Sequence, residues 1–294
     1  MKRIKMKSIV SAAALALSVG LAQAGPVILG GDDLTDHGSR SGGVNLQGWL
    51  YIEKAVSNVL ADATRSGIIT TDIVALGSAA DPTFTGSNAG GAIGSAANVL
   101  GKTVLYVDGA AAINQFFADL ASGLVNPEML WFSGTGAVNN LDASEGLALT
   151  ANAAAIDAFG VSGGGIIAHR SGSTAYGWLS ALLPGLNDGG GCNSTGATLT
   201  AAGNAAFPGL SNSNIDANAG PCHSSFTGNF GGLTTLAFDG NQRSYIIGGG
   251  AGTVIQCGQA GQPACPTPEP ASLPLIAIAG LAMGMVGLRR RKAK

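Results

Sequence analysis

Short apolar runs alternate with helical stretches from residue 25 to residue 168, and this alternation constrains the fold more than any other feature of the sequence. The apolar runs predict strands at 26–29, 72–76, 103–107, 129–132 and 165–168. Between them, apolar residues recur at three-to-four spacing and predict helices at 46–63, 111–124 and 143–159. Buried strands separated by helices are typical of a parallel sheet covered on both faces. We therefore predict an open α/β fold.

The composition changes after residue 171, where Gly, Asn and Ser replace the long apolar periods. Short runs at 233–238, 244–247 and 253–256 predict strands, and Gly-rich turns separate them. We therefore predict a core at 25–171 and a small, Gly-rich antiparallel β addition within a loop-rich extension at 172–257. Residues 258–267, rich in Gln, Gly and Pro, are predicted to form a linker.

Both ends of the chain predict export. Residues 1–24 hold four basic residues, an apolar stretch and a small-x-small site, which together indicate a signal peptide cleaved after Ala24. At the other end, the uncharged segment 273–288 precedes Arg289, Arg290, Arg291 and Lys292. This pattern predicts one membrane-spanning segment with a cytoplasmic basic end.

A Pro-Glu-Pro triplet, Pro268, Glu269 and Pro270, stands directly before that segment. The triplet, the apolar segment and the arginine cluster, over residues 268–294, resemble the PEP-CTERM sorting signal of Gram-negative bacteria. The resemblance implies passage through the inner membrane, removal of the tail by an exosortase-type peptidase, and delivery to the cell surface or the medium. Signal peptidase is the other processing partner, and exopolysaccharide is a candidate surface partner. A permanent C-terminal anchor is the alternative.

The body left after both ends are removed is acidic. Residues 25–267 hold six Lys and Arg against sixteen Asp and Glu, a formal charge of −10 with neutral histidines. Because binding to polyanions depends on clustered basic side chains, we expect no nucleic-acid partner.

Four cysteines, Cys192, Cys222, Cys257 and Cys265, lie in the last third of the body. An even number of cysteines in an exported protein favours disulfides. The shortest loops pair Cys192 with Cys222 and Cys257 with Cys265, although the sequence leaves three connectivities open. No Cys-x2-Cys spacing supports a metal site instead.

Residues 129–136 (MLWFSGTG) and 162–169 (SGGGIIAH), with a predicted helix between them, resemble the class I glutamine amidotransferase-like superfamily and its ThuA-like branch. The resemblance implies a flavodoxin-like sheet. It does not imply glutaminase chemistry, because the body has no cysteine before Cys192 and therefore no nucleophile elbow.

The segment after the first predicted strand carries the densest group of chemically active side chains, Asp32, Asp33, Asp36 and His37. Ligands bind at the carboxyl ends of strands in open α/β sheets, so this loop is a candidate divalent-cation site. Its oxygens suit Ca²⁺, and His37 would also admit Zn²⁺ or Mn²⁺. The alternative is a solvated loop in which Asp32 or Asp33 caps the next element.

His169 follows the fifth predicted strand at the same sheet edge, and His223 follows Cys222. Both are candidate catalytic residues, either as general bases or around a bound ion or water. Two functions follow: a non-enzymatic exported surface or matrix protein, or a secreted metal-dependent hydrolase. Convergence of the three histidines with the aspartates favours the hydrolase, and their scattering favours the surface protein.

Overall fold

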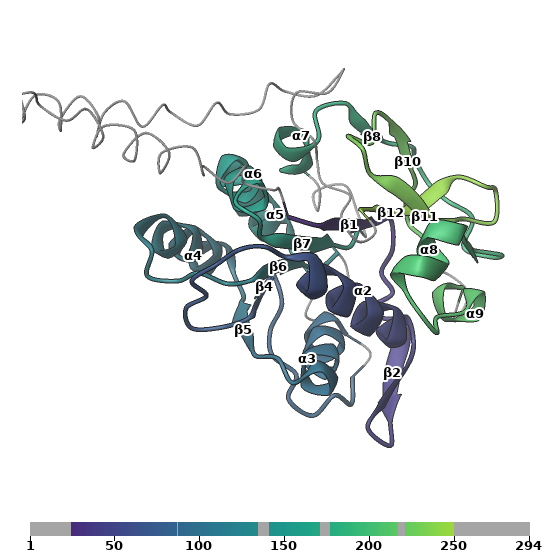
Figure 1. The fold of residues 1–294 in the computed structure, drawn as a ribbon, viewed down its shortest axis with the longest axis horizontal. Helices are drawn as coiled ribbons and strands as arrows, with labels where there is room; N and C mark the ends of the chain where they lie inside the picture. Colours follow the sequence, from purple (N-terminus) through teal and green to yellow (C-terminus); the bar gives the residue numbers. More distant parts are fainter. Residues whose placement is uncertain (1–24, 87, 135–140, 171–176, 217–220, 250–294) are drawn as a thin grey trace, which may run out of the picture. The chain divides into compact units, whose positions relative to one another are not determined.

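A computed structural model describes residues 25–249 except 87, 135–140, 171–176 and 217–220. It confirms the predicted α/β fold, with a mixed, mostly parallel sheet covered by helices (Figure 1). The strands run in the order β5-β4-β6-β7-β1-β12-β10-β8. The five parallel strands are β1 (Val27–Gly30), β4 (Ile73–Leu76), β5 (Val104–Val107), β6 (Met129–Phe132) and β7 (Gly165–Ala168). Four of these five strands have every residue buried, as expected where helices cover both faces.

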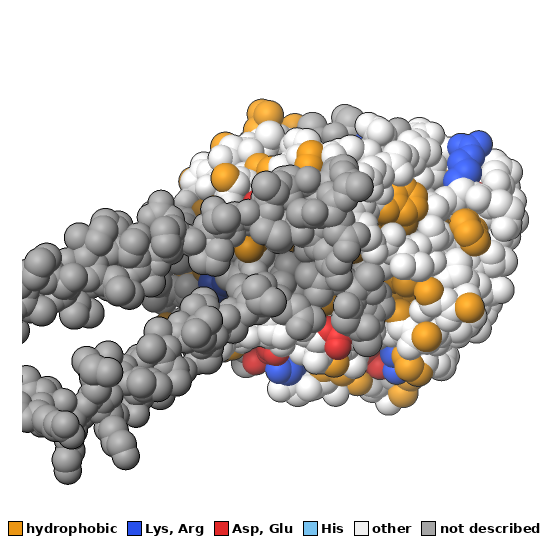
Figure 2. All heavy atoms as spheres, turned by 45° about the horizontal axis from the view of Figure 1, so that its top comes forward, with side chains coloured by type: hydrophobic (Ala, Val, Ile, Leu, Met, Phe, Trp, Pro, Cys, Tyr) orange, Lys and Arg blue, Asp and Glu red, His pale blue; other side chains and the backbone are white. Residues whose placement is uncertain are grey.

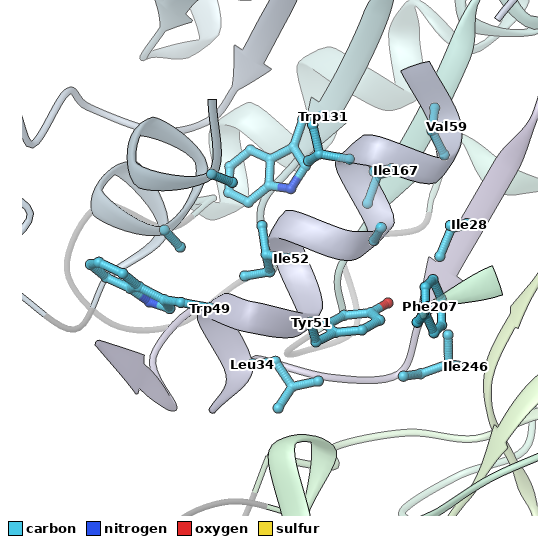
Figure 3. Close-up of a cluster of buried hydrophobic side chains, with 14 of the residues drawn as sticks. Ile28, Leu34, Trp49, Tyr51, Ile52, Val59, Trp131, Ile167, Phe207 and Ile246 are labelled. Atoms are coloured by element: carbon cyan, nitrogen blue, oxygen red, sulfur yellow. The ribbon is translucent and has the colours of Figure 1, made fainter. Parts of the chain in front are cut away.

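One face of the sheet packs against α2 (Gly48–Asp62), α3 (Ala89–Leu100), α8 (Ala201–Ala206) and α9 (Asn212–Ile215). Figure 3 shows part of this layer, where Ile52 of α2 lies toward Trp131 and Ile167 of the sheet and Tyr51 lies beside Phe207. The other face packs against α4 (Ala110–Ser122), α5 (Ala143–Ala151), α6 (Ala153–Val161) and α7 (Leu179–Leu182). The two hydrophobic cores therefore fix the sheet from both sides.

The predicted antiparallel addition continues the parallel sheet. Its strands are β8 (Leu186–Asp188), β9 (Thr198–Leu199), β10 (Phe226–Gly228), β11 (Thr234–Phe238) and β12 (Ser244–Gly248). Strand β12 pairs antiparallel with β1, so the addition shares the core of the parallel sheet. The predicted disulfide Cys192–Cys222 is present, whereas Cys257, Cys265 and the predicted strand 253–256 lie outside the described residues.

Several elements were not predicted: the hairpin at 38–47 and helix α3 in the core, and α7, α8, α9, β8, β9 and β10 in the extension. Residues 38–47 form a hairpin of β2 (Gly38–Ser41) and β3 (Val44–Gln47), so Leu46 lies in a strand and the following helix begins at Gly48. Helix α3 has few large apolar residues to mark a helical period, yet Asn88 caps it by accepting from the Gly91 amide at 2.7 Å. Its small residues let it approach α2, because a Cβ at Gly91 would lie 2.9 Å from the Trp49 ring.

The helix predicted at 143–159 is two helices, which meet at Asn152. The Asn152 side chain donates to the Asn114 side chain and to the Ala148 carbonyl, both at 2.8 Å. Asparagine side chains compete in this way with the helical backbone. The single-helix prediction was therefore wrong at this residue.

The predicted signal peptide, linker, sorting triplet and membrane segment 273–288 lie outside the described residues. Within the described ranges, no helix is both long and apolar enough to cross a membrane. Figure 2 shows that charged side chains are sparse on one face of the molecule, in keeping with a chain in which 11% of residues are charged.

Candidate functional site

The candidate site lies where β1 and β7 end side by side. Leu29 of β1 is in register with Ala168 of β7, so the segments that begin at Gly31 and His169 leave the sheet at the same edge. Asp32 and Asp33 follow Gly31, and these two carboxylates contact all three histidines of the chain.

The segment around Cys222 packs directly onto this edge. Asp32 forms an isolated β-bridge with Cys222. The amides of His223 and Ser224 donate to the Gly31 carbonyl at 2.8 and 3.0 Å, and the Asp33 amide donates to the Pro221 carbonyl at 3.0 Å. The Cys192–Cys222 disulfide adjoins His223 in the chain, so backbone bonds and a covalent bond together position this histidine.

Asp32 and His169 form a fully buried pair. Asp32 Oδ1 lies 2.8 Å from His169 Nδ1 and accepts from the Leu34 amide at 3.0 Å. The Trp131 indole N–H donates to His169 Nε2 at 3.1 Å. Because an indole N–H can only donate, His169 Nε2 must accept, and its proton therefore resides on Nδ1, facing Asp32.

Asp33 joins the other two histidines and lies nearer the surface. Its Oδ2 is 2.7 Å from His223 Nε2, and its Oδ1 is 3.3 Å from His37 Nε2. The side chains of Asp33, His37 and His223 are 13, 20 and 40% exposed. Within the described ranges, Asp33 Oδ1 is buried and makes no well-aligned hydrogen bond. Here the Asp33 cluster means Asp33, His37 and His223.

Each member of the Asp33 cluster shifts the pKa values of the others. Burial raises the pKa of Asp33, but hydrogen bonds and charge interactions with His223 and His37 outweigh it, so that the pKa lies below its ordinary value. The close contact with the Asp33 carboxylate is the largest cause of the raised pKa of His37 and of His223, and it exceeds the opposing effect of burial. The cluster therefore favours a negative carboxylate beside protonated imidazoles.

Asp32 is fully buried and Asp33, taken as a whole residue, is 9% exposed, so this part of the loop is not solvated. The capping bond of the alternative is present, because Asp32 Oδ1 accepts from the Leu34 amide at 3.0 Å. Of the four residues predicted to bind a cation, Asp33 and His37 are in contact, whereas Asp32 is bonded to His169. Asp36 accepts from the Thr35 hydroxyl at 3.5 Å. Among the residues that the structure describes, no group of three or more His, Cys, Asp and Glu side chains is arranged to hold a metal ion.

Two residues of the site were not assigned a role from the sequence. Trp131 fixes the His169 tautomer, and the Tyr51 and His169 rings lie nearly perpendicular with their centroids 6.2 Å apart. The three-to-four spacing of apolar residues in α2 places Tyr51 in a helix, but it gives no sign that Tyr51 contacts His169. Gly30 is also required, because a Cβ there would collide with Asp32 Oδ2.

Comparison of the chain with protein-family models, curated proteins and solved structures found no match. The geometry of the site is therefore the basis for assigning a function.

Removing either member of the buried pair leaves its partner unsatisfied. We expect Asp32→Ala and His169→Ala each to lower the free energy of unfolding by about 3 kcal/mol. The double variant should lose less free energy of unfolding than the two single variants lose together. The difference, measured by urea denaturation, should give a coupling energy of about 1–3 kcal/mol.

Asp239 supplies the control for this cycle, because its buried carboxylate accepts from the amides of Asn193, Asn241 and Arg243. When Asp239→Ala and His169→Ala are combined, their losses in free energy of unfolding should add. Equal coupling in both cycles would contradict a specific Asp32–His169 bond.

The pKa shifts around Asp33 determine how stability changes with pH. Because the pKa values of His37 and His223 are raised, their stabilisation is complete below their ordinary 6.5 and is lost as pH rises through the folded-state values. Asp33 has a lowered pKa, so its contribution is complete above 3.8 and is lost as pH falls through its folded-state value. Asp33→Asn should remove both trends and lower both histidine pKa values in an NMR titration. Unchanged histidine titrations in this variant would refute the assignment.

Proposed function

We propose that the chain is exported and sorted to the cell surface, and that it acts there as a metal-dependent hydrolase through the Asp33 cluster. Export rests on the predicted signal peptide and the PEP-CTERM-like tail. The hydrolase proposal rests on one observation: the three histidines of the chain, distant in sequence, all contact two consecutive aspartates at the end of β1.

The Asp33 cluster offers two imidazoles and one carboxylate, a ligand set that suits zinc-class ions better than Ca²⁺. Both imidazoles present Nε2 toward Asp33, at 2.7 and 3.3 Å. The buried Asp33 Oδ1 makes no well-aligned hydrogen bond among the described residues, which supports a role as a ligand. The described residues are not arranged around an ion as they stand, so binding would require these side chains to rearrange and would release the protons that they share.

A zinc-class ion with three protein ligands keeps a position for water and lowers the pKa of that water to about 7. The exposure of His223 and His37 gives a substrate access to this position. The buried Asp32–His169 pair has a structural role in this proposal. It holds the backbone at Asp32 in place, and Asp33 is the next residue in the chain, so the pair fixes the position of Asp33. In this proposal Asp32 positions Asp33 and does not bind the ion.

The test is metal binding and hydrolysis by the full chain after treatment with EDTA. We expect Zn²⁺ or Mn²⁺ to raise the melting temperature by several degrees, and Ca²⁺ to do so less. Asp33→Asn and His223→Asn should abolish the shift, whereas Asp119→Asn, on the exposed side of α4, should retain it. Chromogenic esters, phosphoesters and glycosides then test turnover with the bound ion.

The two measurements separate the proposed hydrolase from a non-enzymatic surface protein. Metal binding with no turnover of any substrate class would favour a metal-binding surface protein. Absence of a metal-dependent shift would refute the cation site, and the Asp33 cluster would then be a proton-sharing structural feature.

A further inference from the structure

A cavity lies away from the Asp33 cluster, between α4 and α6. It has a volume of about 280 Å³. Phe117 and Leu120 of α4 and Ala155 and Phe159 of α6 form its apolar walls, and Arg65 and Ser162 also line it. Ligand pockets of about 300–1,000 Å³ accept drug-sized molecules, so this cavity suits a smaller ligand.

Arg65 brings a positive charge to this apolar cavity. Its guanidinium lies over the Phe159 ring, 4.6 Å from the centroid, and Nε donates to Asn126 Oδ1 at 2.6 Å. A second donor, Nη1, bonds to the Ser162 hydroxyl. The Asn126 amide group is itself fixed by the carbonyls of Ser66 and Gly67, at 2.9 and 2.7 Å. Arg65 is therefore held in place by neutral partners.

The charge of Arg65 has no carboxylate partner in the described part of the chain, where every Lys, Arg or His ion pair involves other residues. Of the five N–H donors of a guanidinium, the two bonds above use two. Partial burial lowers the pKa of Arg65, but a guanidinium still keeps its charge at neutral pH.

Arg65 is also not needed as a helix cap. The last carbonyls of α6 accept from other groups, with the Ser162 amide bonded to Ala158, the Gly164 amide to Phe159 and the Gly25 amide to Gly160. At the end of α4, the amides of Gly123 and Leu124 bond to Leu120 and Asp119. The guanidinium therefore remains able to bind an anion.

We propose that this cavity binds a small amphiphilic carboxylate, with the carboxylate on Arg65 and a short alkyl chain between α4 and α6. Guanidinium and carboxylate match as a bidentate pair. The apolar walls then select the tail, and the cavity volume limits its length. This site is independent of the Asp33 cluster and of the proposed hydrolase activity.

The test is calorimetric titration of the full chain with butanoate, hexanoate and octanoate, and with octan-1-ol as the uncharged probe. We expect saturable octanoate binding at one site, with affinity rising about fourfold per methylene until the cavity is full. Arg65→Gln should weaken octanoate binding at least tenfold and leave any octan-1-ol binding unchanged. Ala158 of α6 also lines the cavity, so Ala158→Phe should weaken octanoate binding tenfold by filling it. This second variant keeps the test valid if Arg65→Gln does not fold.

Arg40→Gln is the matched control, because Arg40 also lies over a phenylalanine ring, Phe84 at 5.0 Å, and donates to an asparagine, Asn98 at 2.7 Å. It should bind octanoate as the unsubstituted chain does. The proposal fails if octanoate binding is not saturable, if Arg40→Gln weakens it equally, or if octan-1-ol binds as tightly. Binding to anionic vesicles without binding to octanoate would also overturn it, in favour of a membrane contact.

Discussion

Strand β1 pairs in parallel with β7 on one side and antiparallel with β12 on the other, and these two pairings join the halves of the molecule. The same strand delivers Asp32 and Asp33 to the sheet edge, next to the end of β7 and the segment that carries Cys222. Packing on both faces fixes the register of β1, because a slip of one residue would move Ile28 into the opposite core and Val27 and Leu29 into the core that Ile28 now occupies. The position of the site therefore follows from the pairing of one four-residue strand.

The alternation of an extended chain explains why consecutive aspartates take different roles. Neighbouring side chains in an extended segment point to opposite sides, so Asp32 turns inward to His169 and Asp33 turns outward to His37 and His223. A buried carboxylate is costly unless hydrogen-bonded, and the Leu34 amide and His169 both bond to Asp32 Oδ1. The inner pair thus adds rigidity, and the outer cluster keeps chemically active groups near solvent.

The sequence predicted strands β6 and β7 to the residue, because continuous apolar runs between turn-forming residues mark buried strands. Helix α3 was missed because its small residues give no apolar period, although those same residues permit its close packing on α2. The acidic loop was identified as a candidate site, since three carboxylates and a histidine lie within six residues. Which aspartate meets which histidine depends on register and on the packing of the Cys222 segment, and neither is encoded in local spacing.

Asp32 and Trp131 together hold His169 in one tautomer, beneath an outer cluster whose imidazoles present Nε2 to Asp33. The most direct measurement is a long-range ¹H–¹⁵N NMR correlation of the three histidine rings. The structure predicts a proton on Nδ1 and none on Nε2 for His169, with Nε2 protonated in His37 and His223. A proton on His169 Nε2 would be incompatible with this arrangement, because the Trp131 indole N–H would then have no acceptor.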